Sequence, residues 1–187
     1  IGPSQQRHGA SAIRFIDLDG DEDFDLAWGD YFQRSLYIIW NIGTVEIPNM
    51  DQDNFVYQFP VDDPIYTAGQ NMPSFADLDG DNDMDLYITV LGGDGPVQLN
   101  NNFLMYENIG TNTDPIYEHT TDNFLNSLDL LSNVAPEFVD IDDDGNLDFF
   151  VGQDYTTETS PTMGRLYHFN NDGLAHPTWT LNNPEFL

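Results

Sequence analysis

The sequence contains neither cysteine nor lysine, and both absences limit what the protein can do. Without cysteine the chain forms no disulfide bond, and its redox compartment cannot be inferred. Without lysine it has no side-chain amine for Schiff-base formation or for acid–base catalysis. No apolar run approaches the roughly 18 residues of a membrane-spanning helix, so we expect no membrane span.

Positive charge is also scarce. Four basic residues, all of them arginine, accompany 33 acidic residues, and the formal net charge is −29. Phosphate groups and anionic membrane surfaces are bound by clustered lysine and arginine. We therefore expect no nucleic-acid partner. An acidic surplus of this size suits a protein in a salty or calcium-rich medium.

Familiar catalytic motifs are missing as well. The chain has no Gly-x-Ser-x-Gly sequence, no phosphate-cradling glycine loop and no His-Glu-x-x-His zinc pattern. Its histidines are scattered singly, which predicts structural roles and no metal-binding trio: His8, His119, His168 and His176. We predict no catalytic residue and no enzymatic activity.

Aspartate is abundant, and it is arranged in three copies of one nine-residue pattern. The copies occupy residues 17–25, 77–85 and 140–148, so their starts are 60 and 63 residues apart. Acidic side chains at the first, third, fifth and ninth positions, with a backbone carbonyl at the seventh, can surround one calcium ion with oxygen. We predict about three calcium ions, one per copy. The candidate ligands are Asp17, Asp19, Asp21, Asp23 and Asp25; Asp77, Asp79, Asp81, Asp83 and Asp85; and Asp140, Asp142, Asp144, Asn146 and Asp148.

Glycine permits the tight turn in each acidic segment. Gly20 and Gly80 hold the fourth position, whereas the third copy has Gly145 at its sixth. This third copy opens like an EF-hand, but its twelfth position is Val151 in place of the bidentate glutamate, and its flanks have strand character. The alternative to metal binding is three solvated acidic turns. Neighbouring carboxylates repel by roughly 1 kcal/mol per pair even in water, and three copies in one register argue against that alternative.

The repetition extends beyond the aspartates. Each copy follows a Phe-x-Asp strand end and precedes a short apolar strand, a third strand that ends in a glycine turn, and a proline-containing loop. Short β-rich runs divided by Gly, Asn, Asp and Pro indicate an all-β fold. Four strands in about 60 residues match one blade of a β-propeller. We expect a single propeller segment of three four-stranded antiparallel blades at about residues 8–60, 68–127 and 133–187, with fourth strands at 53–57, 122–125 and 184–187.

The pattern Phe-x-Asp-h-Asp-Gly-Asp-x-Asp-h-Asp-Leu (h, hydrophobic), followed by Asn-Ile-Gly-Thr, resembles the FG-GAP/VCBS repeat of integrin α-chain propellers and many secreted bacterial proteins. The third copy departs from it at residues 143–146 but keeps every ligand position. The resemblance implies a propeller of about seven or eight blades, with calcium tying together the first two strands of a blade. It also implies a secreted or cell-surface setting, where calcium is millimolar, and a bacterial source.

Three blades cannot close a ring, because propellers need about four to eight. We therefore expect the remaining blades to come from a longer chain or from further copies of this one, joined at unpaired strand edges. The first residues, Ile1, Gly2 and Pro3, include no initiator methionine, which suggests a processed or excerpted chain.

The leading functional hypothesis is a non-catalytic, calcium-binding extracellular module that mediates adhesion or binding to a glycan or protein. A second is a structural subunit that assembles through blade edges into a ring or filament. A third is part of a lyase-like, carbohydrate-active propeller enzyme with catalytic groups on other blades. The aromatic candidates for glycan stacking, near strand ends or loops, are Trp28, Trp40, Trp179, Tyr31 and Tyr155. We expect Trp28, Tyr31 and Tyr155 on a loop face, whereas Trp40 is predicted to pack between blades.

Overall fold

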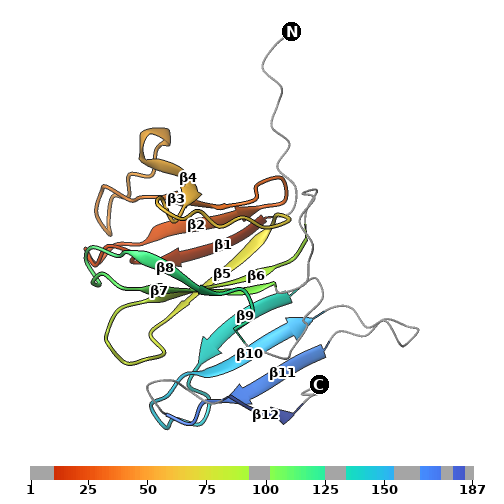
Figure 1. The fold of residues 1–187 in the computed structure, drawn as a ribbon. Coiled ribbons are helices and arrows are strands. Elements are labelled where there is room, and N and C mark those ends of the chain that lie inside the picture. Colours follow the sequence, from red (N-terminus) through yellow and green to blue (C-terminus); the bar gives the residue numbers. More distant parts are fainter. Residues whose placement is uncertain (1–10, 93–101, 125–133, 154–164, 174–178, 184–187) are drawn as a thin grey trace.

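The computed structural model describes residues 11–92, 102–124, 134–153, 165–173 and 179–183. These residues form three four-stranded antiparallel sheets (Figure 1). Sheet 1 contains β1 (Ser11–Ile16), β2 (Asp25–Asp30), β3 (Leu36–Ile39) and β4 (Phe55–Phe59), with a short 3₁₀ turn, η1 (Gln52–Asn54). Sheet 2 contains β5 (Asn71–Ala76), β6 (Asp85–Val90), β7 (Phe103–Asn108) and β8 (Tyr117–Thr121). Sheet 3 contains β9 (Val134–Val139), β10 (Asp148–Gln153), β11 (Arg165–Asn170) and β12 (Thr180–Asn183).

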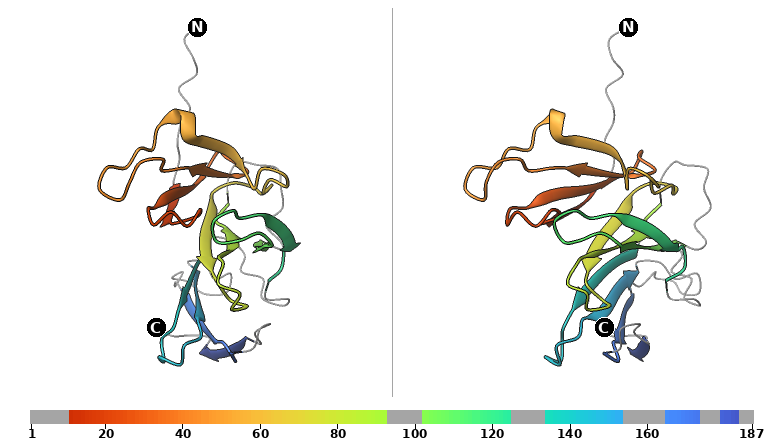
Figure 2. Two further views of the ribbon diagram at one scale, coloured as in Figure 1. Left: turned by 90° about the vertical axis from the view of Figure 1, so that its left-hand side faces the viewer. Right: turned by 60° about the vertical axis from the view of Figure 1, so that its left-hand side comes forward.

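Within each sheet the strands lie side by side in chain order. This meander confirms the prediction of an all-β chain with four antiparallel strands per repeat. The first strands of the sheets are neighbours, because β5 contacts both β1 and β9. The three sheets therefore follow one another in a row, with sheet 2 in the middle (Figures 1 and 2).

The second strand of sheet 2, β6, is covered on both sides. All six of its residues are buried, although a strand exposed on one face would alternate between apolar and polar side chains. Leu86 and Ile88 belong to the core between sheets 1 and 2, where they join Leu36 and Ile38. Tyr87 points the other way and joins the core between sheets 2 and 3.

The core between sheets 2 and 3 is aromatic. Phe103 of β7 stacks on Phe149 of β10 with ring centroids 5.2 Å apart, and Tyr87 lies 4.7 Å from Phe138 of β9. Burying a side chain of this size contributes about 1.5–3 kcal/mol. An ion pair also crosses the row of first strands: the Arg14 guanidinium of β1 donates two hydrogen bonds of 2.8 Å to the Glu137 carboxylate of β9.

The predicted fourth strand of the second repeat was wrong in position. In sheet 2 the strand is β8, which ends at Thr121, before the predicted segment 122–125. Its apolar anchor is Tyr117, which packs against Phe59 with a ring distance of 5.3 Å, whereas Phe124 packs on Tyr87 from the following turn. In sheet 3 the strand is β12; the predicted segment 184–187 lies outside the described residues.

The fourth strand of sheet 1, β4, begins and ends two residues later than the predicted segment 53–57. Among the residues that the structure describes, no helix has the length and apolar character needed to cross a bilayer.

Candidate metal centres

Each acidic segment is the loop that joins the first two strands of a sheet. The strand register brings the ends of the loop together, because Ile16 pairs with Asp25, Ala76 with Asp85, and Val139 pairs with Asp148. The first position of the loop therefore directly follows one strand, and the ninth position begins the next. We refer to residues 17–25, 77–85 and 140–148 as loops 1, 2 and 3.

In all three loops the carboxylates at the first, third and fifth positions converge. One oxygen from each lies within 4.8 Å of the others, in a geometry that could hold a metal ion. The groups are Asp17, Asp19 and Asp21; Asp77, Asp79 and Asp81; and Asp140, Asp142 and Asp144. The structure thus brings together nine of the predicted ligand side chains, in three sets of three.

Backbone hydrogen bonds hold the first carboxylate in place. In loop 1 the Asp17 oxygens accept from the backbone N–H groups of Asp21 and Glu22, both at 3.1 Å. In loop 3 the Asp140 oxygens accept in the same way from Asp144 at 3.1 Å and Gly145 at 2.9 Å. These bonds wrap the loop around its own first residue, so the fifth position is held close to the first.

The turn needs two residues in the left-handed region, at the fourth and sixth positions. Loop 1 uses Gly20 (φ 69°) and Glu22 (φ 73°), and loop 3 uses Asp143 (φ 62°) and Gly145 (φ 90°). Loop 2 has Gly80 at the fourth position and Asn82 at the sixth, at φ 80° and 73°. Because either position benefits from glycine, the displaced glycine of loop 3 leaves the shape of the loop unchanged.

The ninth-position aspartate is buried in every loop, and it connects the loop to the end of the third strand. Asp25 Oδ1 accepts from the Asn41 backbone N–H at 2.8 Å, and its Oδ2 accepts from Leu18 at 3.1 Å. Asp85 accepts from the Asn108 backbone N–H at 3.0 Å. The equivalent bond in sheet 3, from Asn171 to Asp148, measures 3.1 Å and completes the set.

The asparagine in this connection was missed as part of the site. The Asn-x-Gly segment was predicted only as a turn, although the asparagine recurs at this place in all three repeats. Its side chain organises the loop toward the fourth strand, because Asn108 Oδ1 accepts from the backbone N–H groups of Gly110 and Ile116, both at 3.0 Å. Asn41 Oδ1 accepts from Gly43 and Asn49 in the same manner.

The carboxylates of the loops are held in surroundings that disfavour their charge. Burial raises the pKa of Asp85 to about 7 and the pKa of Asp25 to about 6. Burial, together with repulsion from Asp81, raises the pKa of Asp83 to about 6. Burial and neighbouring carboxylates also raise the pKa of Asp19, and the pKa of Asp142 rises for the same reasons. A cation among these groups would remove this penalty.

Several carboxylate oxygens are buried without a hydrogen-bond donor. Among the described residues, Asp19 Oδ1, Asp23 Oδ1 and Asp83 Oδ1 have no partner. A buried acceptor without a partner costs about 1–3 kcal/mol, and a carboxylate costs more. The donor set and these oxygens therefore fit a cation. The seventh-position residues, predicted to offer a backbone carbonyl, have buried side chains in loops 1 and 2, and their carbonyl role stays a prediction.

Among the described residues, the other candidates do not belong to the carboxylate triads, although His168 Nε2 lies 3.8 Å from the ninth-position carboxylate of Asp148. His119 lies 2.8 Å from Asp122, and His168 stacks on Phe150 with ring centroids 4.3 Å apart. Trp40 packs against the core between sheets 1 and 2, as predicted. Tyr31, predicted on a loop face, follows β2 directly and contacts Phe32 with a ring distance of 5.1 Å. His8, His176 and Tyr155 lie outside the described residues.

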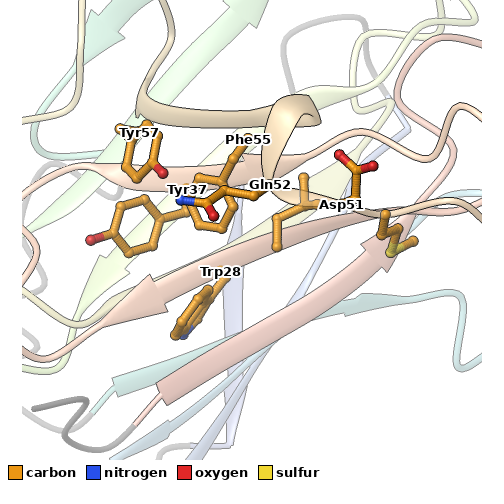
Figure 3. Close-up of a pocket in the computed structure, with 8 residues that line it drawn as sticks. Trp28, Tyr37, Asp51, Gln52, Phe55 and Tyr57 are labelled. Carbon is orange, nitrogen blue, oxygen red and sulfur yellow. The ribbon is translucent and has the colours of Figure 1, made fainter. Parts of the chain in front are cut away.

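Trp28 lies within β2 and not on a loop face. It belongs to an open groove of about 330 Å³ on sheet 1, on the side away from sheet 2. Figure 3 shows its ring beside those of Tyr37, Phe55 and Tyr57, with Asp51 and Gln52 nearby. The rings of Trp28 and Tyr37 are 5.2 Å apart, and those of Phe55 and Tyr57 are 4.6 Å apart.

No protein-family model matches this chain, and comparison with curated proteins and with solved structures finds no significant relative. The interpretation of the loops therefore depends on their own geometry and chemistry.

Proposed function

We propose that each of the three loops binds one calcium ion and that the chain is a segment of an FG-GAP/VCBS-type β-propeller. It acts as a non-catalytic extracellular module that presents a rigid surface for adhesion to a glycan or protein. The observation that carries the metal assignment is the convergence of three carboxylate oxygens within 4.8 Å, repeated in all three loops.

The donor set favours calcium over other metals. The described groups contain only carboxylates, and no histidine joins them, so the nitrogen and sulfur ligands preferred by zinc are missing. Magnesium requires near-ideal octahedral geometry and usually keeps several water molecules. A nine-residue loop with four carboxylates and a carbonyl fits the larger, more adaptable shell of calcium.

Calcium in loop 2 would be held by Asp77, Asp79, Asp81 and Asp85, with the carbonyl of Asp83. It supplies positive charge to carboxylates that repel one another, and it stabilises the folded form by mass action. Because Asp85 also accepts from the Asn108 backbone N–H, the loop joins three of the four strands of its sheet. The ion therefore has a structural role, suited to a rigid binding module.

The extracellular assignment is supported by the type of site and by the charge. Weak modular calcium sites are tuned to millimolar concentrations outside cells, and a net charge of −29 suits a soluble protein in such a medium. The choice of a glycan or protein ligand is supported by the resemblance to adhesive repeats.

The test is a calcium titration by calorimetry, combined with thermal unfolding of an Asp79→Ala variant. We expect about three calcium ions per wild-type chain and about two for the variant, with little difference in Tm between the two proteins in EGTA. Asp62→Ala is the matched control, since Asp62 is an exposed acidic residue outside the loops. A wild-type chain without saturable calcium binding, or a variant with equal losses of Tm in both buffers, would overturn the assignment.

The adhesive role needs a separate experiment. Labelled protein is applied to a glycan array and to immobilised extracellular-matrix proteins, in calcium and in EGTA. Binding that depends on calcium supports the module hypothesis. Failure to bind any surface, in a protein that does bind calcium, would reject adhesion and leave the structural role of the ion intact.

A further inference from the structure

Sheets 1 and 3 stand at the two ends of the row, and each turns one face away from sheet 2 (Figure 1). We call the outward face of sheet 1 the head face. Ile13, Trp28 and Tyr37 share it because residues paired directly across strands lie on the same face of a sheet. Phe15 lies two residues after Ile13, and ring contacts add Tyr57 and Phe55. The outward face of sheet 3, the tail face, contains Val139, Ile141 and Phe150. Both faces expose large apolar side chains.

Comparison of the three repeats shows that the head face corresponds to faces that are buried in sheets 2 and 3. Phe15, Phe75 and Phe138 each precede the first aspartate of a loop by two residues. Phe75 is 6% exposed in the core between sheets 1 and 2, and Phe138 is 8% exposed in the core between sheets 2 and 3. Phe15 is 55% exposed. In sheets 2 and 3 the phenylalanine at this position is buried against the preceding sheet, whereas in sheet 1 it is exposed on the head face.

The tail face likewise exposes a residue that sheets 1 and 2 bury against the following sheet. The second loop position is Leu18, Leu78 or Ile141. Leu18 shares a core with Phe75, and Leu78 shares a core with Phe138, so each junction places this residue in the same core as the phenylalanine of the next sheet. Leu18 and Leu78 are 3% and 8% exposed, whereas Ile141 is 50% exposed.

We propose that copies of this chain associate head to tail, with the tail face of one copy packed on the head face of the next. Ile141 and Val139 of one copy then share a core with Phe15 of its neighbour, as Leu18 does with Phe75 and Leu78 does with Phe138 inside the chain. The new junction continues two interfaces that the chain already forms. Such an association is heterologous, so it generates a ring if the rotation closes and a filament if it does not.

The register favours another sheet of this repeat over a glycan as the occupant of the head face. Trp28 occupies the position of Ile88 in sheet 2 and of Val151 in sheet 3, three residues after the ninth-position aspartate. Ile88 and Val151 are both fully buried against the preceding sheet. The contact uses sheet faces, and it does not require the strand-edge pairing expected from the sequence.

Charge opposes this association, because each copy carries a net charge of −29. Salt screens such repulsion over about 8 Å at physiological ionic strength. Association should therefore strengthen as sodium chloride is added, which is the usual direction for contacts between apolar faces of like-charged proteins. The proposed association does not depend on which cation the loops bind. Its failure can therefore be distinguished from a failure of calcium binding, which the calorimetric titration measures separately.

The test is sedimentation velocity of the wild-type chain and of Phe15→Gln and Ile141→Gln, in calcium buffer at physiological salt. Both side chains are more than two-fifths exposed, so the substitutions leave the folded chain intact, which circular dichroism verifies. Val45→Gln is the matched control, because Val45 is exposed on a turn outside both faces. We expect concentration-dependent oligomers of the wild type and the control, and association at least tenfold weaker for each face variant alone.

Mixing the two face variants gives the decisive result. Phe15→Gln keeps an intact tail face and Ile141→Gln keeps an intact head face, so an equimolar mixture should form dimers and nothing larger. A wild-type chain that stays monomeric at roughly 0.1 mM overturns the proposal. So does a dimer that survives Ile141→Gln but not Phe15→Gln, since that pattern means two head faces in contact. Equal loss in Val45→Gln would also reject it.

Discussion

Replacing Asp85 by asparagine should change stability in opposite directions with and without calcium. Asp85 is buried, accepts from the Asn108 backbone N–H at 3.0 Å and lies 3.4 Å from the Tyr87 hydroxyl. In EGTA its charge is a cost, because burial raises its pKa to about 7. In calcium the same charge is a ligand. Asp85→Asn keeps the shape and the accepted hydrogen bond but removes the charge.

The size of the effect follows from the pKa. A value of about 7 in place of 3.8 corresponds to about 4 kcal/mol against the ionised form at about pH 8. The new amide group must find an acceptor, and the Tyr87 hydroxyl is within reach. Because this bond is imperfect, we expect about half of the 4 kcal/mol to appear as a net gain in stability. In EGTA the variant should be more stable by about 2 kcal/mol, or roughly 4–8 °C in Tm for a chain of this length.

The assay is thermal unfolding followed by circular dichroism at about pH 8, in EGTA and in millimolar calcium. In calcium the variant should be less stable than the wild type, because a ligand oxygen is lost and calcium stabilises it less. Glu46→Gln, at an exposed position in a turn, controls for the change in net charge. Equal destabilisation of Asp85→Asn in both buffers would refute the reasoning, since it would make Asp85 a purely structural acceptor.

Three further results are expected. Glu22→Gly should raise stability by about 0.5–1 kcal/mol in both buffers, because Glu22 has φ 73° and glycine removes the strain; denaturant unfolding measures it. Asn108→Ala should lower stability by about 2–4 kcal/mol in both buffers, because Gly110 and Ile116 lose the acceptor of their N–H groups; thermal unfolding measures it. Calcium affinity should fall from about pH 8 to about pH 6, because protons compete for Asp85, and calorimetry should detect proton release on binding.

Each of these results has a contrasting measurement. Asn82→Gly should gain less than Glu22→Gly, since asparagine tolerates the left-handed conformation better. Asn108→Asp retains an acceptor and should be less damaging than Asn108→Ala. In EGTA the pH dependence has the opposite sign to that of calcium binding. The raised pKa values of Asp25 and Asp85 stabilise the metal-free fold below about pH 4, and this stability is lost as pH rises through about 6 to 7. A Tm in EGTA that rises over this range would contradict the pKa assignment.

Much of the fold was predictable because the repeat marks its own strand boundaries. The ninth-position aspartate begins β2, β6 and β10 in the structure, and the Phe-x-Asp segments end β1, β5 and β9. The fourth strands were less predictable, because their start depends on a tertiary contact: Asn108 Oδ1 binds the N–H of Ile116, and β8 begins at the next residue. No local pattern in the segment after Gly110 indicates that contact.

The site was predictable in part for the same reason. Period-two spacing placed the first, third and fifth carboxylates together, and the structure brings them within 4.8 Å. The role of Asn41, Asn108 and Asn171 was not predicted, because their distance from the ninth-position aspartate varies with the length of the intervening strands and loops. That loop 3 tolerates its displaced glycine also could not be predicted, because it is evident only from the dihedral angles of Asp143 and Gly145.

The complete burial of β6 has a consequence for how the chain unfolds. Its two faces belong to different cores, so neither neighbouring sheet can come apart without exposing one side of it. Such an array behaves as a row of units whose stability resides largely in the junctions between neighbours. The end sheets should open first, and the amide protons of β6 should be the slowest to exchange with solvent. The middle repeat would then be the last structure to persist, because neither side of its second strand is in contact with water.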